Sequence, residues 1–207
     1  METTNTEIQE VINKALIEVV KINGDKLQYI QDSFKTYDVC LEAVKNNGKA
    51  LEYVPSDIIT YDLCMEAVKN DGMVLRFVPD KYRDYKLCLE AVKQNGAAYY
   101  YVPIAHRQDK LKTEALNNNG AVLKYMKDSY LTTDMVMVAV SNNGMALEYA
   151  HSAYKTKEVC VRAYKQNNAC IGCIPTDILD EVLSDVSEFD EVTEDNTEDD
   201  NTEIGED

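Results

Sequence analysis

The chain of 207 residues has no tryptophan, only two histidines and four prolines, and no basic residue after Asp177. No apolar run approaches the roughly 20 residues that a membrane span requires, so we expect no membrane contact. The first residues carry no basic leader before an apolar stretch, so we expect no secretory signal. His106 and His151 belong to no Ser/His/Asp or Cys/His arrangement. We therefore expect no enzymatic activity, no cofactor and no metal site.

Acidic residues are concentrated at the C-terminal end. The net charge is −16, and fifteen acidic residues lie from Asp177 onward, whereas residues 1–176 hold 22 acidic and 21 basic residues. We expect residues 191–207 to form a disordered acidic tail, because their composition offers little apolar surface to offset the entropy of ordering. The near-neutral remainder lacks the cationic surface that displaces counterions from a nucleic acid, so we expect no direct nucleic-acid binding.

A 24-residue repeat organises the rest of the chain. It is marked by evenly spaced glycines, which are Gly24, Gly48, Gly72, Gly96, Gly120 and Gly144, with Asn168 at the next place in the series. A unit of this length buries its apolar face only by stacking against its neighbours. The sequence therefore predicts an all-α fold, an α-solenoid of helix–turn–helix repeats. We expect an N-terminal capping helix over residues 1–24, about six units over 25–176, a C-terminal capping helix over 177–190 and the tail.

Each unit contains the same local signals. A helix of ten residues ends just before the glycine, and its N-cap falls twelve residues after the previous one, at Thr36, Thr60, Asp84, Thr132 and Thr156. We expect the glycine to end the helix in a left-handed conformation, which costs a residue without a Cβ little. A short second helix, anchored by leucine and an aromatic residue, then ends at a proline in most units.

The six cysteines favour a reduced, cytoplasmic protein. Four of them, Cys40, Cys64, Cys88 and Cys160, recur at one place in their units, as small buried core residues do. Cys170 and Cys173 form a C-x-x-C pair, which is also found in redox and zinc sites. We interpret this pair as core, because it occupies the places that Ala146 and Tyr149 hold one unit earlier.

The repeat is broken between Tyr99 and Thr113. Tyr99 replaces a core leucine, and Tyr100 takes a place that is charged in other units. Residues 81–127 hold nine basic and four acidic residues, and Lys112 stands where other units have cysteine or valine. Two interpretations stay open, a mobile joint in the solenoid or a docking face for an anionic partner. The candidate partner-binding residues are Tyr100, Arg107, Lys110 and Lys112.

The pattern A-V-K-N-N-G-x-A-L-x-Y-V-P, followed by D-x-x-C-L-E-A-V-K, resembles the tandem helical repeats of the domain-of-unknown-function 4116 family. Residues 38–55, 62–79 and 86–103 carry the resemblance, and 110–127, 134–151 and 158–175 carry it more loosely. The family is known from bacteria, protists and large DNA viruses, and no catalytic residue is established for it, so the resemblance implies none here. The asparagine, lysine, tyrosine and isoleucine usage favours a viral or microbial source.

The function predicted from these features is a non-enzymatic protein–protein interaction module, a repeat scaffold or adaptor that acts in the cytoplasm, or in that of a host if the source is viral. Its partner is a protein, and we expect a monomer or weak oligomer. The alternative is an inhibitor whose acidic tail mimics nucleic acid and blocks a nucleic-acid-binding or defence protein. A tail that only keeps the protein soluble is a third interpretation.

Overall fold

A computed structural model describes residues 5–194 of the chain, in which every regular element is a helix and no strand occurs. This confirms the all-α prediction. The α-helices are α1 (Asn5–Ile22), α2 (Tyr37–Asn46), α3 (Tyr61–Asn70), α4 (Tyr85–Gln94), α5 (Asp109–Asn118), α6 (Thr133–Asn142), α7 (Lys157–Gln166) and α8 (Leu179–Glu194). Six-residue 3-10 helices follow the first seven: η1 (Gly24–Tyr29), η3 (Gly48–Tyr53), η4 (Gly72–Phe77), η6 (Gly96–Tyr101), η8 (Gly120–Tyr125), η10 (Gly144–Tyr149) and η12 (Asn168–Cys173). Single turns of 3-10 helix lie between some units: η2 (Asp32–Phe34), η5 (Asp80–Tyr82), η7 (Ile104–His106), η9 (Asp128–Tyr130) and η11 (Ser152–Tyr154).

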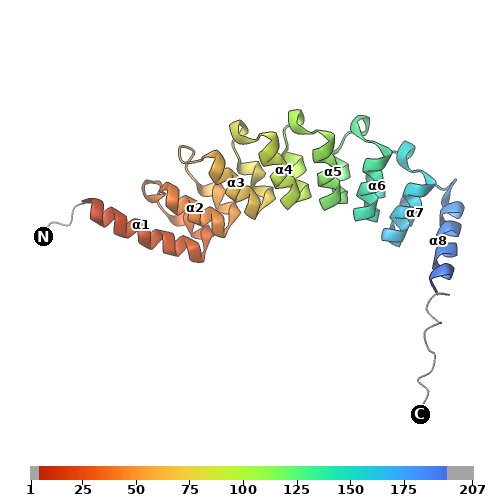
Figure 1. Cartoon of the computed structure of the whole chain (residues 1–207), viewed down its shortest axis with the longest axis horizontal. Helices are drawn as coiled ribbons and strands as arrows, with labels where there is room; N and C mark the ends of the chain where they lie inside the picture. The colour runs from red at the N-terminus through yellow and green to blue at the C-terminus, as the bar shows by residue number, and fades with distance from the viewer. Residues whose placement is uncertain (1–4, 195–207) are drawn as a thin grey trace, which may run out of the picture.

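The elements form two layers that run the length of an arched stack (Figure 1). In one layer each α-helix packs on the next, from α1 to α8, and in the other each six-residue 3-10 helix packs on the next. The core lies between the layers. In α2 it takes Val39, Cys40, Ala43 and Val44, and in η3 it takes Ala50 and Leu51. The same places are buried in the units of α3 to α6, as expected for a solenoid, whereas in the last unit Tyr164 is half-buried and Ile171 is exposed.

Local signals start most α-helices where the sequence predicts. The side chains of Thr36, Thr60, Asp84, Thr132 and Thr156 each accept a hydrogen bond from the backbone amide three residues on. The second helix of each unit is a 3-10 helix, which is typical of such short segments. It starts at an asparagine or aspartate whose side chain accepts from the amide two residues on, as Asn47 does from Lys49 at 3.0 Å.

The repeat glycines have a different role from the one predicted. No glycine in the described residues has a positive φ, so the expectation of a left-handed helix end is wrong. A Cβ on Gly48 would lie 2.6 Å from the carbonyl oxygen of Ala67 in the next unit, closer than real Cβ contacts come. The glycines therefore let neighbouring units approach. Asn168, in the unit that α8 follows, is exposed where these glycines are buried, which explains why a side chain is accepted there.

Side-chain amides join each unit to the preceding one. The Oδ1 of Asn46 accepts from the amide of Gly24 at 2.7 Å, and its Nδ2 donates to the carbonyl of Lys21 at 2.7 Å. One amide side chain thus pairs a donor at the start of η1 with an acceptor at the end of α1. A pair of bonds of this kind recurs in each unit, and the two glutamines donate to the carbonyl one residue further along than the asparagines do. We call these residues the amide clamp: Asn46, Asn70, Gln94, Asn118, Asn142 and Gln166.

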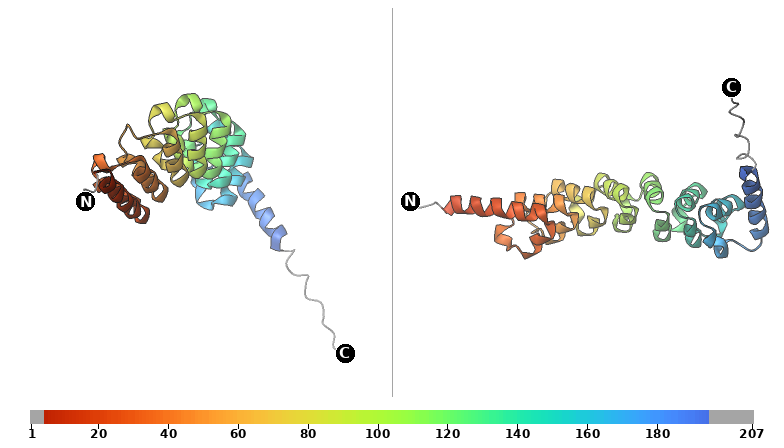
Figure 2. Two further views of the ribbon diagram at one scale, coloured as in Figure 1. Left: turned by 60° about the vertical axis from the view of Figure 1, so that its left-hand side comes forward. Right: turned by 90° about the horizontal axis from the view of Figure 1, so that it is seen from below.

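The two end helices differ from the predicted caps. α1 extends beyond the stack along its long axis (Figure 2), so Val20 is buried whereas Ile8 and Val11 stay exposed. α8 continues to Glu194, four residues past the predicted limit at 190. Residues 195–207, the larger part of the predicted acidic tail, lie outside the described residues.

Candidate functional site

The break in the repeat lies on α5, which lacks the N-cap of its neighbours. Gln108 holds the N-cap place with backbone angles close to those of Thr36, but its side chain makes no capping bond. Lys112, which stands where other units have cysteine or valine, is only 6% exposed. A lysine is rarely buried without partners, so its contacts define the local structure.

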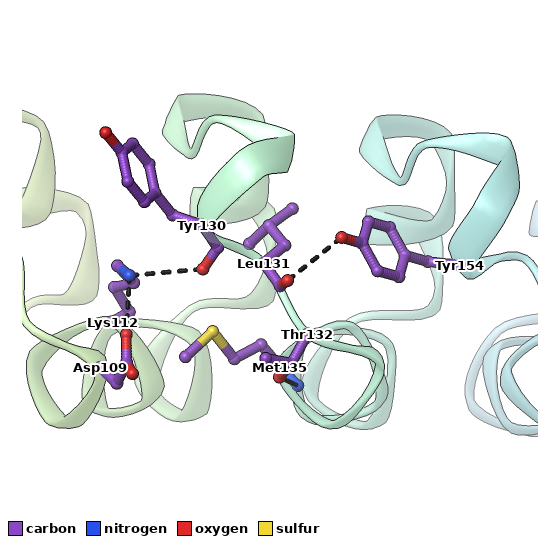
Figure 3. A network of polar contacts seen from close by, with 7 residues as sticks. All are labelled: Asp109, Lys112, Tyr130, Leu131, Thr132, Met135 and Tyr154. Atoms are coloured by element: carbon purple, nitrogen blue, oxygen red, sulfur yellow. Dashed lines mark hydrogen bonds and ion pairs between the residues drawn. The ribbon is translucent and has the colours of Figure 1, made fainter.

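Lys112 is held by one carboxylate and one carbonyl. Its Nζ lies 2.8 Å from Asp109 Oδ1 and 3.3 Å from the carbonyl oxygen of Tyr130 in the next unit (Figure 3). It also lies 5.3 Å from the centre of the Tyr130 ring. Of the four predicted partner-binding residues, Lys112 is therefore not available on the outer surface.

Tyr130 lacks a hydrogen bond that the tyrosines at the same place in two other units make. Tyr82 and Tyr154 hold the same place, and their hydroxyls donate to the carbonyls of Ile59 and Leu131, each at 3.1 Å. The equivalent bond from Tyr130, to the carbonyl of Arg107, is not formed. Its ring lies over Lys112 and its hydroxyl points away from the backbone (Figure 3). Tyr130 is consequently 61% exposed.

Arg107 is anchored by backbone carbonyls but lacks the acid that its counterpart has. Its Nε donates to Val102 O at 3.0 Å and its Nη2 to Tyr100 O at 3.3 Å. Arg83, one unit earlier, makes the same pair of bonds and also an ion pair with Asp80 at 3.3 Å.

Ile104 stands at the place of Asp80. Arg107 consequently has no ion pair with any side chain that the structure describes, and its guanidinium lies 4.9 Å from the ring centre of Tyr99. Burial raises the pKa of the Tyr99 phenol, and Arg107 opposes that rise.

A pocket of about 210 Å³ opens between these groups. It is lined by Tyr99, Ile104, Arg107, Lys112, Met126, Lys127 and Tyr130. Three of its lining residues are cationic and the others are apolar or aromatic. The arrangement suits a small anionic group next to apolar atoms.

The remaining predicted residues lie outside the pocket. Tyr100 is 56% exposed, and its ring contacts those of Tyr101 and Tyr125 edge-on, with 5.1 Å between centres in each pair. Lys110 is exposed near the start of α5. The structure thus brings Arg107 and Lys112 together and links Tyr100 to them only through its carbonyl.

Several pocket residues were not predicted. The sequence could have indicated Ile104 and Lys127 as site residues, because each differs from the residue that other units have at its place. Met126 and Tyr130 carried none, since an apolar or aromatic residue is ordinary there.

The four cysteines that recur at one place in their units are buried core groups. Burial raises the pKa of the thiols of Cys40, Cys64, Cys88 and Cys160 to about 11, so they stay protonated near neutral pH. Cys170 is buried and Cys173 half-buried, and both are free thiols. Within residues 5–194, no three His, Cys, Asp or Glu side chains are grouped so that they could hold a metal ion. Nor is any helix in that range both long and apolar enough to cross a membrane.

Comparison with known families settles the relationship of the repeats. The sequence profile described as "Domain of unknown function (DUF4116)" matches residues 16–59, 61–106 and 113–155, which together are more than half of the chain. The chain belongs to this family. No curated protein and no solved structure matches it.

The DUF4116 match confirms the resemblance drawn from the repeat pattern. It also leaves residues 107–112 unmatched between two of its segments. That gap holds Arg107, Lys110 and Lys112, whereas the other five residues that line the pocket lie within matched segments. The match ends at residue 155, although α7 packs on α6 as the earlier α-helices pack on one another.

Proposed function

We propose that this DUF4116 protein is a non-enzymatic interaction module, a repeat scaffold or adaptor that binds another protein beside α5. The supporting observation is a set of exposed apolar and aromatic side chains, the aromatic patch, which consists of Tyr100, Ile104, Tyr125 and Tyr130. Tyr100 contacts Tyr125, and Ile104 shares the pocket with Tyr130. Arg107 donates to the carbonyl of Tyr100 and lines the pocket with Ile104 and Tyr130.

Such a patch has the composition of a protein interface. Tyrosine and arginine are enriched among the residues that contribute most to binding. Ile104 is 80% exposed, which costs free energy in water unless a partner covers it. A solenoid also tolerates outer-face changes, because each unit keeps its own core.

Affinity capture from extract of the native cell tests this proposal. We expect Tyr100→Ala combined with Lys110→Ala to lose a partner that the wild-type chain captures, with an unchanged circular dichroism spectrum. Tyr29→Ala is the matched control, since Tyr29 is 74% exposed at the other end of the stack. Equal capture by all three proteins would show that the aromatic patch is not the contact.

The free cysteines support action in a reducing compartment such as the cytoplasm. We do not propose the nucleic-acid mimic, because most of the tail on which it depends lies outside the described residues.

A further inference from the structure

Departures from the repeat converge on the pocket. Ile104 stands where Asp32 and Asp80 stand in other units, and Lys127 stands where Pro55 and Pro79 stand. Tyr99 replaces a leucine and Lys112 replaces a cysteine or valine. These positions are spread over 29 residues of sequence, and all four side chains line one pocket.

Two of these departures leave the pocket more positive, and a third adds a cation that a local carboxylate neutralises. Lys112 and Lys127 each add a cation, and Ile104 removes the carboxylate that neutralises the equivalent arginine. Asp109 neutralises Lys112 at 2.8 Å. Arg107 and Lys127 then remain without an ion pair among the side chains that the structure describes.

Arg107 is oriented but not saturated. Its two carbonyl bonds hold the guanidinium against Tyr99. A guanidinium carries five N–H donors, so donors are left for a further acceptor. The neighbouring carboxylate that Arg83 binds is absent here, so a carboxylate from outside has an open place on Arg107.

The size of the pocket limits its occupant. Its volume of about 210 Å³ is below the roughly 300–1,000 Å³ of sites for cofactors and drug-sized ligands. One acidic side chain fits this space better than a nucleotide does. Ile104, Met126 and Tyr130 offer apolar contact to the atoms beside the carboxylate.

We propose that this pocket binds a glutamate or aspartate side chain from an extended segment of the partner protein, with the carboxylate on Arg107 and Lys127 and an adjacent apolar residue against Ile104 and Tyr130. This inference rests on the proposed function and names the chemistry that the interface recognises.

Two labelled peptides test the proposal against the full chain. One carries the central sequence Glu-Leu-Glu and the other Gln-Leu-Gln, in otherwise identical Gly/Ser contexts, and binding is followed by fluorescence anisotropy. We expect the acidic peptide to bind about tenfold or more tightly than the amide peptide, and to weaken as salt is raised. Equal binding of the two peptides overturns the proposal.

Variants locate the binding. Ile104→Asp restores the i, i+3 ion pair that Arg83 makes, and it changes an exposed side chain, so the fold should be kept. It should weaken the acidic peptide about tenfold. Arg107→Gln should do the same, whereas Arg83→Gln removes an equal charge from a paired arginine and should leave affinity unchanged. Loss of affinity in Arg83→Gln equal to that in Arg107→Gln would indicate general charge attraction and reject a built site.

Two further measurements distinguish a partner from the chain's own acidic segment as the source of the carboxylate, and the pocket proposal from the interaction-module proposal. A variant without residues 195–207 should bind the peptide as the full chain does, and a gain in affinity would assign the pocket to the chain's own acidic segment and overturn a partner as the source. If peptide binding fails while partner capture still depends on Tyr100, the carboxylate pocket is wrong and the interaction module stands. If the peptide binds and capture is indifferent to Tyr100, the pocket stands and Tyr100 is not part of the contact.

Discussion

At the scale of single residues, the repeat glycines are fixed by the neighbouring unit. A Cβ on Gly48 or on Gly96 would lie 2.6 Å from a backbone carbonyl oxygen of the next unit, and a backbone atom moves only if the two units separate. We expect Gly48→Ala to lower the free energy of unfolding by about 1–3 kcal/mol, as overpacking of a tight contact does. Urea unfolding measures this.

Gly172→Ala is the matched control. Gly172 lies in η12, and a Cβ there would have no heavy atom within 4 Å. We expect this substitution to be neutral or to stabilise by up to about 1 kcal/mol, because alanine restricts the unfolded chain. If both substitutions destabilised the protein equally, the cost would come from the backbone conformation of glycine. The proposed clash with the carbonyl of the next unit would then be wrong.

The buried thiols predict a loss of stability in alkali. Burial raises the pKa of the Cys40, Cys64 and Cys88 thiols from 9.0 to about 11. Between these values the unfolded chain has released protons that the folded chain keeps. Stability therefore falls as pH rises from about 9 to 11, and below that range the thiols contribute no pH dependence.

Urea midpoints at pH 7, 9 and 10.5 measure the fall. Cys64→Val tests the cause, since Val136 fills the same place in another unit. The variant should lose less stability than the wild type between pH 9 and 10.5. An identical pH profile would assign the loss to lysine or tyrosine groups.

At the scale of elements, α5 is the one helix among α2 to α7 whose N-cap residue makes no side-chain capping bond. The backbone of Gln108 has φ −73° and ψ 160°, against −69° and 163° for the capping residue Thr36. Only the side-chain acceptor is missing. We expect Gln108→Thr to raise the free energy of unfolding by about 1 kcal/mol, seen as a higher urea midpoint with an unchanged slope. Thr60→Gln should cost a similar amount, and no effect of either change would mean that these caps do not contribute to stability.

Local and inter-unit features differ in how far the sequence predicts them. An N-cap such as Thr60 acts on an amide three residues away, so the residue type and its spacing are enough to find it. The bond that the Gly24 amide donates to Asn46 joins residues 22 apart in separate units, and its existence depends on how the units stack. The role of the glycines was missed for the same reason.

The site was partly predictable because charge interrupts a regular pattern. Arg107 and Lys112 were recognised from that interruption. The inward direction of Lys112 was not, since it depends on Asp109 and the carbonyl of Tyr130. Tyr130 itself matches Tyr154 in type, so nothing in the sequence indicates that its hydroxyl loses the inter-unit bond.

At the scale of the whole molecule, the bond between each repeat glycine and the amide side chain of the next unit recurs with the same spacing of 22 residues, so a complete unit should be removable. Deleting residues 61–84 joins Thr60 to Tyr85, which replaces one helix-capping side chain, Asp84, by another. The side chain of Gln94 can then accept the hydrogen bond from the amide of Gly48 that Asn70 accepts in the full chain. We expect a folded, shorter solenoid with the same helix content per residue. Its free energy of unfolding should be lower by the contribution of one repeat unit and one interface between units.

Deleting residues 61–72 is the control, because it removes half a unit and puts Met73, the second residue of η4, directly after Thr60. The α-layer would lose a helix without its 3-10 partner, the amide of Gly48 would lose the side chain of Asn70, and buried faces would meet water. We expect this variant to show reduced helix content by circular dichroism and a broadened or absent unfolding transition. If the two deletions behaved alike, the stack would not be built from interchangeable 24-residue units. A folded whole-unit variant that still binds the acidic peptide would show further that the pocket beside α5 depends on its own unit and immediate neighbours, and not on the length of the arch.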